Sequence, residues 1–129
     1  MSELKPVGIY REMYRAARQD LPSLHESRTE QLADNRDRVI EYMKAATPVF
    51  DVMGDAPDLL DTTKRIGSGP SLISDGEWIW RVDSIHYLSH YPLSIPDEFL
   101  THVHARNYQP AGNVDVADEK FDTAIKTYF

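Results

Sequence analysis

The chain has 129 residues, of which 41% are hydrophobic and 27% charged, a composition typical of a folded globular domain rather than a disordered segment. This length suits one domain, so we predict that residues 1–129 form a single unit. The chain contains no cysteine, which excludes disulfides, thiol nucleophiles and cysteine-bound zinc. No apolar run approaches the ~20 residues that a membrane helix needs, and the first residues do not resemble a secretory signal, so a cytoplasmic protein without membrane contact is expected.

The net charge of −7 is distributed unevenly along the chain. Residues 1–44 contain eight Lys/Arg and eight Asp/Glu, whereas residues 45–129 contain six Lys/Arg and thirteen Asp/Glu. The second segment therefore carries the whole acidic excess. An acidic surface repels nucleic acid and anionic membranes and attracts basic partners. A charge that serves solubility alone is the competing interpretation.

Two helices are predicted in the N-terminal third. Residues 9–19 place apolar side chains at helical spacing, and Pro22 interrupts that pattern. Ser23 and Glu26 then have the spacing of a capping box. The second helix is expected to begin there and to continue to about Ala46.

The middle of the chain has weaker periodicity. Residues 49–52 alternate and predict a short strand, and residues 55–60 indicate a turn or a short helix. Residues 67–70 read Gly-Ser-Gly-Pro but lack the spacing of a phosphate-binding loop, so we interpret them as a connector.

The strongest local signal is a β-hairpin. Residues 71–74 and 77–80 are β-prone runs on either side of Asp75-Gly76, which predicts a type I′ turn. Alternation along the second run places both tryptophans on one face, with Ile79 and Arg81 on the other.

Three helices are predicted after the hairpin, each with a residue suited to a helix start. The first covers about 83–90 and starts at Asp83 or Ser84. The second covers about 97–106 and starts at Pro96, and the third covers about 116–128 and starts at Asp115. Large aromatic side chains are concentrated between residues 71 and 104, and their regular spacing favours a core over an exposed binding platform. The fold class predicted is therefore α+β: a helix-dominated single domain with one small β-hairpin.

Candidate catalytic and metal-binding residues are few. His86 and His90 are four residues apart on a predicted helix, as are Glu98 and His102, and together they are the conceivable ligands of a metal-dependent hydrolase. The pattern lacks a complete zinc ligand set, and nothing activates a serine, threonine or lysine nucleophile. We therefore predict no catalytic residue, no metal and no cofactor.

An acidic run without intervening Lys or Arg begins at residue 51. It consists of Asp51, Asp55, Asp58 and Asp61. The run does not match a calcium-binding EF-hand loop. It is interpreted either as a solvated loop or as an electrostatic docking surface for a basic partner.

Residues 75–103 carry a recurring motif, with an Asp-Gly-x-Trp-x-Trp hairpin followed by a Tyr-rich helix and a Pro-x-Glu-Phe segment. The matching positions are Asp75, Gly76, Trp78, Trp80, Asp83, Tyr87, Tyr91, Leu93, Pro96, Glu98, Phe99 and His102. This motif resembles immunity proteins of bacterial contact-dependent and other polymorphic toxin systems. It covers about a quarter of the chain and has the character of a fold signature.

The resemblance implies a non-enzymatic cytoplasmic inhibitor that binds and occludes one cognate toxin domain, which is expected to be basic. The residues predicted to bind this partner are Asp51, Asp55, Asp58, Asp61, Asp75, Glu77 and Tyr108. Two alternatives stay open: a non-enzymatic adaptor or regulatory protein, and a small metal-dependent hydrolase that uses the histidines named above.

Overall fold

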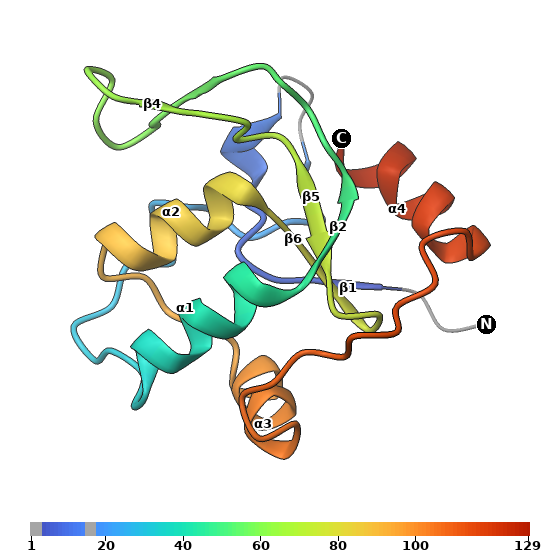
Figure 1. The fold of residues 1–129 in the computed structure, drawn as a ribbon. Helices are drawn as coiled ribbons and strands as arrows, with labels where there is room; N and C mark the ends of the chain where they lie inside the picture. Colours follow the sequence, from blue (N-terminus) through green and yellow to red (C-terminus); the bar gives the residue numbers. More distant parts are fainter. Residues whose placement is uncertain (1–3, 15–17) are drawn as a thin grey trace.

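A four-stranded mixed sheet separates three helices from a fourth (Figure 1). The structure, a computed structural model, describes residues 4–14 and 18–129. The strand order is β1-β6-β5-β2, in which β1 runs parallel to β6 and the other pairs are antiparallel. These strands are β1 (Lys5–Pro6), β2 (Thr47–Phe50), β5 (Leu72–Ser74) and β6 (Trp78–Arg81). A separate two-stranded hairpin pairs β3 (Ala56–Pro57) with β4 (Arg65–Ile66).

The helices cover opposite faces of the sheet (Figure 1). They are the 3-10 turn η1 (Arg11–Met13), α1 (Arg36–Ala45), α2 (Val82–His90), α3 (Asp97–Ala105) and α4 (Glu119–Tyr128). Helices α1, α2 and α3 pack on one side, where Trp80, Tyr87 and Phe99 are fully buried. On the other side α4 inserts Phe121 and Ala124 against the sheet. Successive side chains of β6 point to opposite faces of the sheet. Both tryptophans therefore pack in the core under α1, α2 and α3, and Ile79 packs in the core under α4.

The predicted hairpin is confirmed, but its turn is not of type I′. Strands β5 and β6 pair with Ser74 opposite Ile79, and three residues, 75–77, connect the end of β5 to the start of β6. Within the Asp-Gly pair only Gly76 has a positive φ, of 98°. The Asp75 side chain instead accepts hydrogen bonds from the amides of Glu77 and Trp78, as in an Asx turn, and this fixes the connection.

The predicted helix over residues 9–19 is wrong where the structure describes it. Only η1 is helical, and residues 15–17 lie outside the described part of the chain. Ile9 and Tyr10 are consecutive, yet Ile9 enters the core beneath α4 and Tyr10 enters the core beneath α2. A helix cannot direct neighbouring side chains to opposite faces in this way, so the chain is extended here.

The long helix predicted from Ser23 to Ala46 is confirmed only in its last part, α1. The Glu26 amide does donate to Ser23 Oγ at 3.4 Å, but residues 24–27 form turns and Arg28 forms a β-bridge with Leu93. The next residues pair with the segment after α2, through bonds from the Thr29 amide to the Pro92 carbonyl and from the Ser94 amide to the Ser27 carbonyl. Pairing across the fold therefore overrides the local helix signal.

The remaining differences concern how elements begin. Residues 55–60, predicted as a turn or short helix, contain strand β3. Helix α2 starts at Val82, one residue before Asp83. The Arg81 amide, just before the helix, donates a hydrogen bond to Ser84 Oγ in its first turn. Helix α4 is capped by Asp118, whose side chain accepts from the Lys120 amide, and not by Asp115. Helix α3 has the predicted start after Pro96.

The α+β class is confirmed, with a larger sheet than the single hairpin that the sequence predicted. Within residues 4–14 and 18–129, no helix has both the length and the apolar character needed to cross a bilayer.

Candidate functional site

Asp75 joins the hairpin turn to two helices. Its Oδ1 accepts from the amides of Glu77 and Trp78 at 3.0 and 2.8 Å. Its Oδ2 accepts from the Tyr42 hydroxyl on α1 at 2.5 Å and lies 2.7 Å from Nε2 of His102 on α3. The residue is only 1% exposed. We call Tyr42, Asp75 and His102 the Asp75 cluster.

A second cluster has the same composition. Asp58 Oδ1 accepts from the amides of Leu60 and Asp61 at 2.8 and 3.1 Å. Its Oδ2 accepts from the Tyr91 hydroxyl at 2.7 Å and lies 2.7 Å from His86 Nε2 on α2. Asp58 itself is fully buried. We call Asp58, His86 and Tyr91 the Asp58 cluster, and it anchors the β3–β4 hairpin to α2.

Hydrogen bonding keeps both aspartates ionised. Burial acts to raise the pKa of Asp75, but the bonds from Tyr42, the two turn amides and His102 outweigh it and lower the pKa below its ordinary value. The pKa of Asp58 is lowered in the same way, against the effect of its burial. Burial and the neighbouring carboxylate raise the pKa of Tyr91 to about 12, so its phenol is a donor at neutral pH.

The bonding of the two carboxylates decides what they can do chemically. An ionised carboxylate offers about four lone-pair positions, and each aspartate already faces four donors or imidazole nitrogens. No position is left from which either carboxylate could take a proton from a substrate. These two clusters are therefore cross-links of the fold.

The residues considered for a metal-dependent hydrolase are not gathered around one point. The rings of His86 and His90 lie 4.5 Å apart on α2, but His86 and His102 are held by different buried carboxylates. Glu98 forms an ion pair with Lys5. In the described part of the chain, no group of three His, Cys, Asp or Glu side chains is placed to hold a metal ion.

A buried ion pair lies where β6 passes into α2. Arg81 Nη2 is 2.8 Å from Asp83 Oδ2, and both residues are buried. Burial raises the pKa of Asp83 to about 6 even though Arg81 opposes the shift. Arg81 Nε and Asp83 Oδ1 have no hydrogen-bond partner among residues 4–14 and 18–129. The sequence placed Arg81 opposite the tryptophans but did not indicate that it would be buried.

Two of the seven residues predicted to bind a partner are interior residues. Asp58 and Asp75 are buried, and all their acceptor positions are used, so they cannot contact a partner at the surface. The prediction for these two is corrected. The physical reason is that each sits in a tight turn whose amides need a nearby acceptor.

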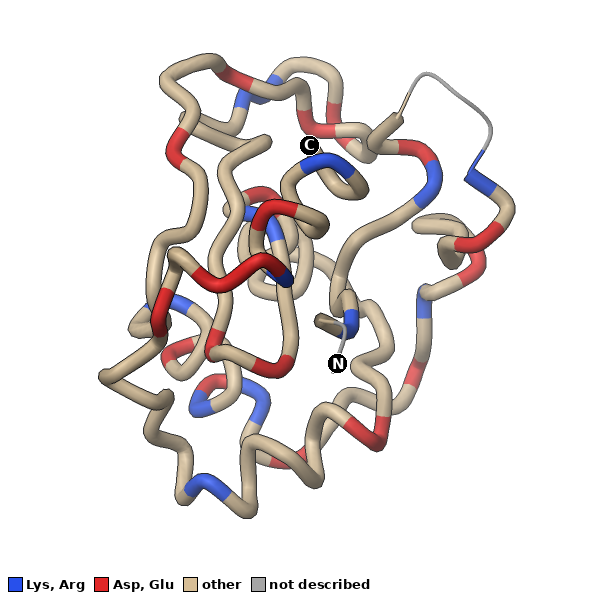
Figure 2. Tube along the Cα trace, turned by 90° about the vertical axis from the view of Figure 1, so that its right-hand side faces the viewer, with Lys and Arg blue, Asp and Glu red and all other residues tan. Residues whose placement is uncertain are grey.

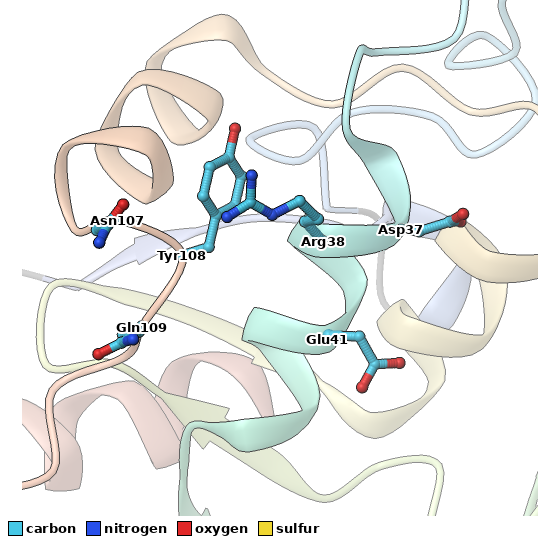
Figure 3. Close-up of a pocket in the computed structure, with 6 residues that line it drawn as sticks. All are labelled: Asp37, Arg38, Glu41, Asn107, Tyr108 and Gln109. Carbon is cyan, nitrogen blue, oxygen red and sulfur yellow. The ribbon is translucent and has the colours of Figure 1, made fainter.

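The other five lie at the surface, and their role in binding stays a prediction. Asp55 and Asp61 are near cations, 3.7 Å from Arg65 and 3.6 Å from Lys64. Asp51 accepts a hydrogen bond from the Ser71 hydroxyl, and Glu77 forms an ion pair with Arg106. Tyr108 is half-buried, with the Arg38 guanidinium over its ring (Figure 3). Much of the acidic run after residue 50 is thus locally neutralised.

The sequence reasoning overlooked a second acidic segment at the start of α4. Acidic residues follow one another along the loop and first turn of this helix (Figure 2). The four exposed members are Asp115, Asp118, Glu119 and Asp122. Lys120 is the single cation between residues 115 and 122, and it donates to the Gly76 carbonyl at 2.6 Å. Local charge counting over this segment would have found it.

Comparison of the chain with protein-family models, with curated proteins and with solved structures finds no match.

Proposed function

We propose that this protein is a non-enzymatic inhibitor that binds a basic toxin domain and occludes it. The observation that supports this proposal is the separation of its ionisable groups. Buried carboxylates are paired with imidazole, phenol and guanidinium groups, whereas the exposed acidic residues of α4 have no such partners among the ion pairs of the described chain. The interior charges thus serve the fold, and the exterior acids of α4 remain for attraction of another molecule.

The physics of association favours a basic partner. A surface with excess negative charge attracts a positive protein over about a Debye length, ~8 Å at physiological ionic strength. Such attraction raises the rate of encounter and suppresses wrong partners, whereas a few desolvated anchors set the rate of dissociation. An inhibitor that must capture a toxin before it acts benefits most from fast encounter.

The test is to identify the protein encoded beside this gene and, where it carries a toxin-like domain, to co-express that domain with this chain. We expect a complex that co-purifies, and an association rate that falls by at least about ten-fold between about 50 and about 500 mM salt. The dissociation rate should change much less. A toxin-like domain that elutes alone, or an association rate that salt does not affect, would contradict the proposal.

A further inference from the structure

An apolar surface lies where strand β2 meets the end of α4 (Figure 1). The rings of Phe50 on β2 and Phe129, the residue after α4, meet edge to face with their centres 4.8 Å apart. Phe129 nevertheless keeps 56% of its surface exposed. Val49 and Ile125 are half-buried and pack at the margin of the same core. We call Val49, Phe50, Ile125 and Phe129 the β2–α4 surface.

Two local features bring these side chains together. The register of β2 is irregular between Pro48 and Phe50, so the consecutive residues Val49 and Phe50 both pack against the core under α4. The Phe129 amide donates to the Ile125 carbonyl at 3.0 Å, which places these two residues one turn apart on the same side of the helix. A molecule that covers Phe129 would therefore remove a large aromatic surface from water.

The outer side of β2 is open in the part of the chain that the structure describes. This strand is the last in the order β1-β6-β5-β2, so it has a neighbouring strand on one side only. A strand from another protein could add to such an edge, but Pro48 in β2 has no N–H to donate to it. Contact with the β2–α4 surface is therefore made by side chains rather than by extension of the sheet.

Acidic side chains extend this surface along α4. Asp122 lies three residues before Ile125 and seven before Phe129, which places it on the same side of the helix. Asp118 lies one turn further back, at the start of the helix. Both aspartates are exposed, and neither forms an ion pair with a residue of the described ranges. Figure 2 shows the acidic positions along the loop and first turn of α4.

The lysines of this region do not neutralise its acids. Residues 115–129 contain four acidic residues and two lysines, which leaves a net charge of −2. Lys120 donates to the Gly76 carbonyl in the hairpin turn. Lys126 is four residues from Asp122, but these two residues do not form an ion pair. Asp51, directly after β2, adds another exposed carboxylate. The β2–α4 surface is thus apolar and has acidic neighbours on both of its elements.

We propose that the β2–α4 surface binds a cationic amphipathic segment of the basic protein partner. Its apolar side chains cover Phe50 and Phe129, and its lysine or arginine side chains lie at Asp118 and Asp122. This inference rests on the proposed function and names the surface through which the partner is held. The acids raise the rate of encounter, and the desolvated aromatic pair slows dissociation.

Charge distinguishes this occupant from a second copy of the chain. In a symmetric dimer the same surface would face itself, so the acids of both copies would be brought together. Like charges that face each other across an interface weaken binding, whereas the cations of a basic partner are attracted.

Synthetic peptides test the surface without the partner. The first peptide places leucines and lysines on opposite sides of a helix. In the second, glutamate replaces every lysine, and in the third, serine replaces every leucine. Each peptide is titrated against the isotopically labelled full chain and followed by NMR. We expect the leucine–lysine peptide to shift the amides of residues 49–51 and 122–129, and the other two to bind at least about ten-fold more weakly. No binding, equal binding by either control peptide, or shifts centred on other elements would overturn the inference.

Matched variants separate this surface from charge and hydrophobicity in general. Asp122→Asn with Phe129→Ala removes one exposed acid and one exposed apolar side chain. Glu30→Gln with Leu32→Ala removes the same two kinds of side chain elsewhere, and Leu32 is 52% exposed. The first pair should weaken binding of the leucine–lysine peptide about ten-fold, and the second by less than about two-fold. Circular dichroism checks that both variants fold. Equal weakening by the two pairs would refute the assignment.

The same variants applied to the toxin complex distinguish the two proposals. A complex that is weakened by the first pair alone supports both. A complex that neither pair weakens, or that both weaken equally, sinks this surface and leaves the proposed function standing. Peptide binding at this surface without any toxin complex sinks the proposed function alone. If sedimentation shows a dimer of this chain that the first pair dissociates, a second copy is the occupant and the inference fails.

Discussion

Replacing Asp75 by alanine tests whether the buried carboxylate clusters hold the fold together. The substitution removes the acceptor for the amides of Glu77 and Trp78, for the Tyr42 hydroxyl and for His102. Tyr42 and Trp78 are buried residues, so their donors are left without water to replace the aspartate. Glu77 is exposed and His102 is partly exposed, and their donors can turn to solvent.

The cost follows from counting the donors that lose every partner. A buried donor without a partner costs about 1–3 kcal/mol, so two of them predict a loss of about 2–6 kcal/mol for Asp75→Ala. This is a large share of the ~5–15 kcal/mol by which a domain is stable. Asp58→Ala also removes the acceptor of four hydrogen bonds. The four residues that donate to Asp58 all retain some exposure, so water can replace the lost carboxylate. We expect it to cost about 1–2 kcal/mol.

Urea denaturation followed by circular dichroism gives both free energies of unfolding, since a domain of this size is expected to unfold in two states. If Asp75→Ala does not fold, Asp75→Asn replaces it, because the amide oxygen still serves the two turn amides. That variant should lose less than the alanine and more than Tyr42→Phe. Equal losses at positions 58 and 75, or a loss below about 1 kcal/mol for Asp75→Ala, would refute the reasoning.

Two further predictions concern the junction of β6 and α2. The folded pKa of Asp83, about 6, lies above its ordinary 3.8, so the folded state binds the proton more readily and stability should fall as pH rises from about 4 to about 6. Asp83→Asn should flatten this part of the profile, by up to about 3 kcal/mol, and parallel melting-temperature profiles for the two proteins would contradict the assignment. A Cβ added at Gly69 would lie 2.8 Å from the Ala56 Cβ and 3.2 Å from the Ile66 carbonyl, so Gly69→Ala should cost about 1–3 kcal/mol by urea denaturation. Gly112→Ala, whose Cβ would meet nothing within 4 Å, should change stability by less than about 0.5 kcal/mol, and an equal effect at both sites would refute the packing argument.

The parts of the fold that the sequence predicted are those fixed by neighbouring residues. The β5–β6 hairpin follows from two β-prone runs around Asp75-Gly76, and α3 follows from Pro96 and the acidic residues after it. The N-terminal third was predicted wrongly because its conformation is set from a distance. Residues 27–29 pair with residues 92–94, and no local pattern contains that partner.

The Asp58 and Asp75 clusters also depend on contacts between residues that are distant in the sequence. The bonds from Asp75 to the amides of its own turn are an Asx turn, which the sequence could have indicated. Its bonds to Tyr42 and His102 join residues 33 and 27 positions away, and those depend on how α1 and α3 pack. An aspartate in an acidic run or in a predicted turn therefore looks the same in sequence whether it faces solvent or closes a polar cross-link. This is why Asp58 and Asp75 were predicted as surface residues.

The burial of these acids changes the charge that a partner meets, but not its sign. After residue 44 the chain has thirteen acidic and six basic residues. Asp58, Asp75 and Asp83 are buried, as is Arg81, which leaves ten acidic and five basic residues toward solvent. The exterior excess in this segment is thus five rather than seven. Because attraction at a distance depends on this net value and on where it is concentrated, the balance of exposed charge in this segment moves from the locally paired run after residue 50 toward the start of α4.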